Sequence, residues 1–131
     1  MILEPSAEAN HLANLVIGAA IEVHRHLGPG YLESVYEECL GIELTERGIE
    51  FQRQHPISVR YKGHIAGESR LDLLVGKILI VELKAVDALA PIHTAQVISY
   101  LKATELRLGL LINFNTVLLR NGIDRIVLGN G

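Results

Sequence analysis

The sequence predicts an α/β domain in which a mixed central β-sheet is flanked by helices. In the first third of the chain, apolar residues recur at three- and four-residue steps, as in amphipathic helices. The pattern then changes to the alternation and the dense β-branched runs that are typical of strands. One more helical pattern interrupts these strands, so the expected order is two helices, three strands, a helix, and two or three strands.

Two helices are expected at the start, over about 8–27 and 31–47. Ser6 or Asn10 is suited to cap the first helix, because both side chains accept hydrogen bonds from free backbone N–H groups. The Gly28-Pro29-Gly30 segment ends it, since glycine and proline together interrupt regular structure.

The middle of the chain has the patterns of strands. Residues 57–61 alternate apolar and polar side chains, and Lys62-Gly63-His64 indicates a turn. A second strand then runs to about Val75. Residues 78–83 form a dense apolar run, which indicates a central strand that is covered on both faces.

A third helix is expected over about 91–104, because proline at position 91 favours the first helical turn. The apolar run at 106–114 predicts another buried strand. Two short strands, 117–119 and 125–128, are expected around the Asn121-Gly122 turn.

Length and composition favour a soluble single domain. The 131 residues fit one domain, 1–131, in which the sheet and third helix occupy about 50–128. No stretch approaches the roughly 20 apolar residues of a membrane span, and the N-terminus lacks the pattern of a signal peptide, so we expect a cytoplasmic protein. The single cysteine, Cys39, excludes an internal disulfide and is expected to be a small buried apolar residue.

The charge balance is slightly acidic, with a net charge of −3. This argues against a tight non-specific binder of nucleic acid, for which a basic surface is expected. It is compatible with an enzyme that carries an acidic metal site beside a modest basic patch. The best candidates for such a basic edge are Arg47, Arg53, Arg60, Lys62 and Arg70.

Charged residues interrupt two of the apolar strands. Glu82 and Lys84 alternate with apolar residues and therefore project from one face, while Asp72 lies in an equally apolar setting. A three-residue loop, at 75–77 or 76–78, would place Asp72 and Glu82 on the same face. A two-residue loop would place them on opposite faces, and we predict the three-residue loop.

Two facing carboxylates repel each other unless a cation lies between them, and hard divalent cations prefer oxygen ligands. Mg²⁺ would suit such a site, and the backbone carbonyl of Leu83 is a further candidate ligand. Lys84 would then orient or help deprotonate a water molecule, or stabilise developing negative charge. The alternative interpretation is a salt bridge between Glu82 and Lys84, which is less favoured because buried ion pairs rarely stabilise a fold.

Three motifs resemble a known family. Asp72 with Glu82-Leu83-Lys84 matches the D-x(9)-E-x-K signature of the PD-(D/E)XK nuclease superfamily, although Leu71 stands where the older motif has proline. The segment from Gly30 to Tyr36 matches the G-x-x-E-x-x-Y element of the small GxxExxY proteins. The segment from Gln96 to Tyr100 resembles the Q-x-x-x-Y element of RecB-like nucleases, so the resemblance spans about 10–128.

The resemblance implies a restriction-endonuclease-like core and a role for each matching residue. Asp72 and Glu82 would be metal ligands, and Glu33 would reach the metal directly or through water. Lys84 would be the catalytic lysine.

On the third helix, Gln96 would position this lysine or the attacking water. Tyr100 would contact a phosphate or brace the site, and its spacing of four from Gln96 puts both on one helix face. Tyr36 and Tyr100 are equally well interpreted as core aromatics with a solvated hydroxyl.

The expected function is a Mg²⁺-dependent nuclease, with Mn²⁺ able to substitute, that acts on DNA or RNA. The alternative is an inactive nuclease-fold protein that binds nucleic acid or a partner protein. A third interpretation is an interaction protein that dimerises through the first amphipathic helix, whose apolar stripe would pack on the sheet or on a partner. A homodimer or a larger assembly is compatible with all three.

Overall fold

A computed structural model describes residues 4–129 of the chain, and it has an α/β fold built on a five-stranded mixed sheet. The predicted fold class is therefore confirmed. In chain order the elements are α1 (Ala7–Leu27), α2 (Glu33–Glu46), β1 (Phe51–Tyr61), β2 (His64–Val75), β3 (Leu79–Lys84), α3 (Pro91–Thr104), β4 (Leu108–Asn113), the 3-10 helix η1 (Leu119–Gly122) and β5 (Ile123–Val127).

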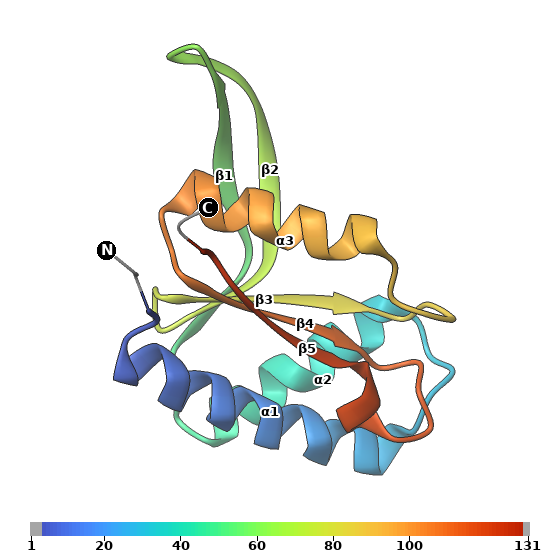
Figure 1. Ribbon diagram of the computed structural model, residues 1–131. Coiled ribbons are helices and arrows are strands. Elements are labelled where there is room, and N and C mark those ends of the chain that lie inside the picture. Colours follow the sequence, from blue (N-terminus) through green and yellow to red (C-terminus); the bar gives the residue numbers. More distant parts are fainter. Residues whose placement is uncertain (1–3, 130–131) are drawn as a thin grey trace.

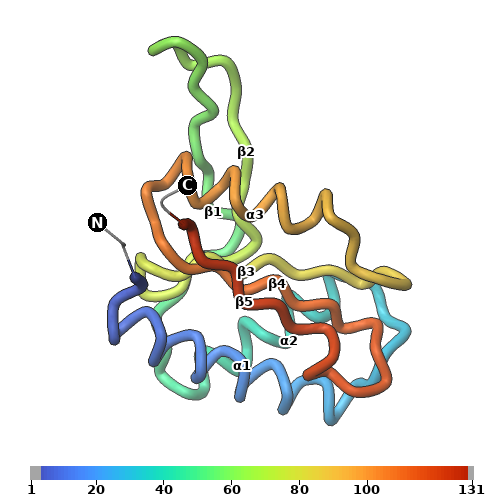
Figure 2. Tube along the Cα trace, viewed as in Figure 1, coloured from blue at the N-terminus to red at the C-terminus, as the bar shows by residue number. Residues whose placement is uncertain are grey.

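The strands lie in the order β1-β2-β3-β4-β5. Only the β3–β4 pair is parallel, and α3 makes the crossover that such a pair requires. In Figure 1, α3 covers one face of the sheet, while α1 and α2 cover the other. The outer halves of β1 and β2 extend beyond these layers as a hairpin arm, which the trace in Figure 2 follows to its tip.

The helix boundaries follow from local chemistry. The Ser6 hydroxyl caps α1 by accepting a hydrogen bond from the N–H of Ala9, at 3.1 Å. Small buried residues on α1, among them Ala13 and Ala19, allow it to pack closely on the sheet. Its apolar stripe thus covers the sheet, which was one of the two expected alternatives. No helix within residues 4–129 is long and apolar enough to span a membrane.

The core has two layers because successive β3 residues face opposite sides. Val81 and Leu83 pack with α1 and α2, whereas Ile80 packs with α3. Cys39 is half-buried against the first layer. In the second layer, Gly109 of β4 permits close approach of α3, since a Cβ there would lie 2.7 Å from Val97 Cγ1.

Two expectations for the strands were wrong. β1 begins at Phe51, not at 57, because its first residues pair with β2 from Phe51↔Val75 onward although their side chains are mostly polar. Residues 117–119 do not form a strand: Val117 is 92% exposed, and the chain enters η1 instead. The Asn121 N–H donates to the Leu118 carbonyl in this turn.

Candidate functional site

The β2–β3 hairpin has the register that brings its acidic residues together. Leu73 pairs with Val81 and Val75 pairs with Leu79, which leaves a three-residue loop at 76–78. The predicted loop length is therefore confirmed. The backbone pairing ends at Leu73↔Val81, and Asp72 and Glu82 are the next residues beyond it on the two strands.

Hydrogen bonds interlock these two residues. The backbone N–H of Asp72 donates to Glu82 Oε2 at 3.2 Å, and the N–H of Leu83 donates to Asp72 Oδ2 at 2.8 Å. Glu82 is only 3% exposed. Burial, followed by the side chain and charge of Asp72, raises the pKa of Glu82 to about 10, against partial opposition from the Asp72 N–H and Lys84. Without a cation, Glu82 therefore holds a proton at neutral pH.

Glu33 approaches Asp72 from α2, of which it is the first residue. Its pKa is raised, first by burial and then by the charge of Asp72, whereas Lys84 lowers it. The loop that leads into α2 is fixed by Tyr36, whose hydroxyl donates to the Gly28 carbonyl at 2.6 Å.

Tyr36 is a core aromatic rather than a ligand contact. Its ring is fully buried and stacks on Phe114, with ring centroids 4.5 Å apart. Its hydroxyl also accepts a hydrogen bond from the N–H of Tyr31. Tyr36 thereby links the core to the segment that positions Glu33.

The two predicted residues of α3 have different surroundings. Lys84 Nζ donates to Gln96 Oε1 at 3.2 Å, so Gln96 orients the ammonium group. One turn later, the Tyr100 hydroxyl lies 3.4 Å from Ser69 Oγ on β2. Tyr100 thus joins α3 to the hairpin, whereas Gln96 contacts the site lysine.

This acid–acid–lysine set lies within a segment that matches a known family. A family model described as the PD-(D/E)XK nuclease superfamily matches residues 10–126. The chain belongs to this superfamily. No curated protein matches the chain at a significant level. The helix-covered mixed sheet is consistent with the restriction-endonuclease-like core of PD-(D/E)XK proteins.

Two polar residues beside the PD-(D/E)XK motif were not predicted. Glu37 is 8% exposed and accepts hydrogen bonds from Arg53, at 3.0 and 3.2 Å, and from Gln54 Nε2, at 2.8 Å. The same Gln54 nitrogen lies 3.5 Å from Asp72 Oδ1. Gln54 therefore bridges α2 and the acidic pair.

The backbone of Gln54 explains how its side chain reaches the site. Its φ is +50°, and it lies between the pairs Arg53↔Leu73 and His55↔Leu71. Arg70 supports the turned peptide by donating to the Gln54 carbonyl at 3.1 Å. Positive φ is uncommon outside glycine, and no sequence pattern marked this position. Glu37 did have a signal, because it lies one helical turn after Glu33.

The predicted basic edge divides into paired and unpaired residues. Arg47, Arg53 and Arg70 form ion pairs with glutamates, at 2.6–3.4 Å. Within residues 4–129, Arg60 and Lys62 have no acidic partner. Lys62 Nζ lies 5.4 Å from the centroid of the Tyr61 ring at the tip of the arm.

The donor set of the site suits a hard divalent cation. Carboxyl oxygens come from Asp72 and Glu82 on adjacent strands and from Glu33 nearby. A cation would offset the burial and the Asp72 charge that together keep Glu82 protonated. With the side chains as they stand in the described part of the chain, no three His, Cys, Asp or Glu residues surround a common ion position.

Proposed function

We propose that this PD-(D/E)XK protein is a metal-dependent nuclease that hydrolyses phosphodiester bonds of DNA or RNA. The observation that carries the proposal is the juxtaposition of Asp72 and Glu82 across the β2–β3 hairpin, with Lys84 two residues further along β3. Membership in the superfamily supports nuclease chemistry, and the preceding GxxExxY element supplies Glu33.

The metal proposed for this site is Mg²⁺, with Mn²⁺ as a substitute. Asp72, Glu82 and the carbonyl of Leu83 would hold it, and Glu33 would do so directly or through water. When bound, such an ion lowers the pKa of a coordinated water and neutralises charge on the phosphoryl group. Because Glu82 must lose its proton to bind a cation, we expect metal affinity to rise with pH.

Lys84 would act on the substrate from a fixed position. Its hydrogen bond to the neutral Gln96 amide orients the ammonium group without cancelling its charge. The charge remains available to donate to a water molecule or to a phosphate oxygen in the transition state. Gln96 would therefore serve as a positioning residue for Lys84.

The acidic net charge favours one alternative, a nuclease-fold protein that binds nucleic acid or a protein partner without cleaving it. The two functions differ in their need for metal. Calorimetric titration with Mg²⁺ or Mn²⁺ should release or absorb heat if the site is a metal centre. A folded protein that gives no heat would favour the alternative.

The decisive experiment compares wild type with Glu82→Ala and Lys84→Ala on labelled single- and double-stranded DNA and RNA in the presence of Mn²⁺. We expect both variants to lose cleavage by at least about a hundredfold. Glu68→Ala is a suitable control, because Glu68 is an exposed carboxylate on the hairpin arm. Cleavage that survives in both site variants would contradict the proposal.

A further inference from the structure

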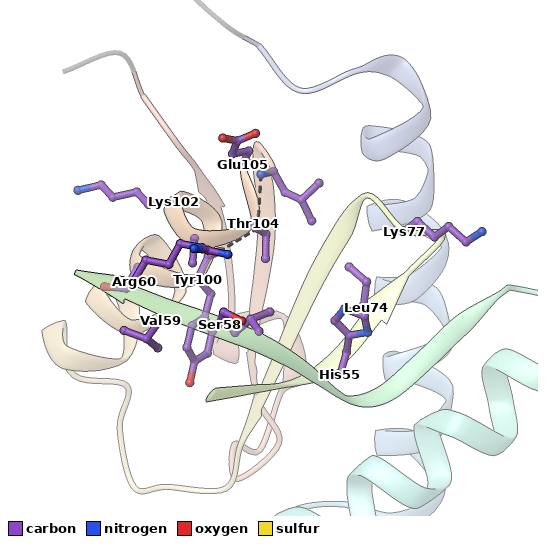
Figure 3. A pocket seen from close by; sticks show the side chains of 14 residues that line it. His55, Ser58, Val59, Arg60, Leu74, Lys77, Tyr100, Lys102, Thr104 and Glu105 are labelled. Carbon is purple, nitrogen blue, oxygen red and sulfur yellow. Dashed lines mark hydrogen bonds between the residues drawn. The ribbon is translucent and has the colours of Figure 1, made fainter. Parts of the chain in front are cut away.

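A second functional surface lies along α3, beyond the acidic pair. A cleft of about 830 Å³ lies between β1 and the C-terminal half of α3, and Tyr100 forms part of its wall (Figure 3). Its lining combines cationic and apolar side chains. None of the residues proposed to hold the metal belongs to this lining.

The charges in the cleft are largely uncompensated. Arg60 of β1 and Lys102 of α3 both line it, and neither has an acidic partner within residues 4–129. Lys77 lies at the other end, with Glu50 at a distance of 3.9 Å. Among the described residues 4–129, Glu105 is the only acidic residue of the lining. This excess of cations stands out in a chain whose net charge is −3.

Much of the remaining lining is apolar and could contact the flat faces of aromatic rings such as nucleic-acid bases. Val59 is 45% exposed, and Figure 3 shows it on the same side of the cleft as Arg60 and Tyr100. Ala103, in the last turn of α3, and Leu106, just after the helix, add aliphatic surface. Cations together with aromatic and aliphatic surface fit a polymer that carries both phosphates and accessible bases. A single strand has this chemistry, whereas a duplex hides its base faces.

We propose that this cleft binds a single-stranded segment of the polynucleotide substrate, with Arg60 and Lys102 contacting its phosphates. The inference rests on the proposed nuclease function for the nature of the ligand. It adds a strand-binding region that is separated from Lys84 by the contact between Tyr100 and Ser69.

The spacing along α3 sets a minimum length for the substrate. Gln96, which contacts Lys84, and Lys102 are six residues apart, or roughly 9 Å along the helix axis. A stacked strand advances roughly 3.4 Å per nucleotide. A substrate must therefore extend about three nucleotides or more from the scissile phosphate to contact both regions.

The test measures binding without turnover. Fluorescence anisotropy with labelled 12-nucleotide oligo(dT) and oligo(U), in a chelator, would compare wild type with Arg60→Ala/Lys102→Ala. We expect the double variant to bind both strands at least tenfold more weakly. Its plot of log affinity against log salt should flatten by about 1.4, because two phosphate contacts are lost.

A matched control is Arg25→Ala/Arg120→Ala, which removes two exposed cations from a different hollow beside α1 and η1. Its affinity should stay within twofold of wild type. Equal weakening in both double variants, an unchanged affinity in the cleft variant, or tighter binding of a 12-base-pair duplex than of the single strands would overturn the proposal. Far-UV circular dichroism checks that both variants are folded.

Failure of this proposal is distinguishable from failure of the nuclease assignment. If the protein does not cleave, the anisotropy measurement still reports on the cleft, since it needs no metal. If it cleaves, the cleft variant should have a raised KM on a 12-nucleotide substrate but an unchanged KM on a dinucleotide. A KM that rises equally on both substrates would show that Arg60 and Lys102 act at the catalytic residues and not at a separate region.

Discussion

The two ends of α3 border surfaces of opposite design. Toward its N-terminus, Gln96 orients Lys84 beside the carboxyl groups of Asp72 and Glu82, which accept hydrogen bonds from the backbone. Toward its C-terminus, Lys102 and Arg60 line an open cleft, and neither forms an ion pair with an acidic residue of the described segment 4–129. At the first surface, hydrogen bonds within the protein already hold the side chains in place. At the second surface, the two cations are not held by ion pairs. The difference separates side chains that need exact placement from those that need only reach a polyanion.

The largest effect is expected at the first surface, when Gln54 is removed. Gln54 contacts Asp72 but has no substrate contact in our proposal. Gln54→Ala should weaken Mn²⁺ binding about 10- to 100-fold, because the Asp72 carboxylate loses a neighbour that helps orient it. Isothermal titration calorimetry would measure this. Gln52→Ala is the matched control, since Gln52 is an exposed residue two positions earlier on the same strand. Identical metal affinities in the two variants would mean that Gln54 only joins α2 to β1.

A second prediction concerns the pH dependence of stability, which Glu82 beside the first surface should dominate. In the metal-free protein, folded Glu82 keeps its proton up to a pH of about 10, while the unfolded chain releases it near the ordinary glutamate pKa of 4.5. Between these values the folded state binds more protons, so its free energy of unfolding should fall as pH rises, by up to ~1.4 kcal/mol per unit.

Urea denaturation at pH 5 to 8 in a chelator would detect this dependence. Glu82→Gln should flatten it and be more stable than wild type at pH 8, because its amide needs no proton. Glu105→Gln, at the C-terminal end of α3, should keep the wild-type dependence of unfolding free energy on pH. If Glu82→Gln and wild type show parallel pH profiles, the carboxyl group is charged in the folded protein.

The smallest expected effect lies at the boundary between the two surfaces. Tyr100→Phe removes a hydroxyl whose neighbour is Ser69, at 3.4 Å, so we expect a loss of less than ~1 kcal/mol in stability and a kcat within threefold of wild type. Thermal unfolding and steady-state kinetics would measure both. Ser69→Ala should have the same effect, and the double variant should add little. A tenfold rise in KM for Tyr100→Phe alone would instead identify Tyr100 as a phosphate contact.

Sequence patterns located the elements of this fold well where periodicity was strong. The helix over 91–104 was predicted with its observed bounds, because the proline at position 91 marks its start. The first six residues of β1 were missed because their stability comes from backbone pairing with β2 and not from an apolar pattern. The strand expected at 117–119 failed because Val117 and Leu118 are exposed, and only Leu119 is buried, as the first residue of η1.

The acidic pair could be placed from sequence because strand alternation and a three-residue loop determine which side chains face each other. The supporting residues could not. Gln54 reaches Asp72 through a local distortion of β1, and the cleft joins Arg60 to Lys102 across 42 positions of sequence. Such contacts depend on the three-dimensional path of the hairpin arm, which no local pattern encodes.

The absence of a side chain at Gly109 affects the position of α3 along its whole length. The missing side chain on β4 sets how deeply this helix sits, because even a methyl group would collide with Val97. Any larger residue would push α3 away from the sheet. Gln96 would then withdraw from its lysine and the cleft would widen at the same time. A substitution at this position, far from either surface, would thus impair the proposed cleavage and the proposed strand binding together.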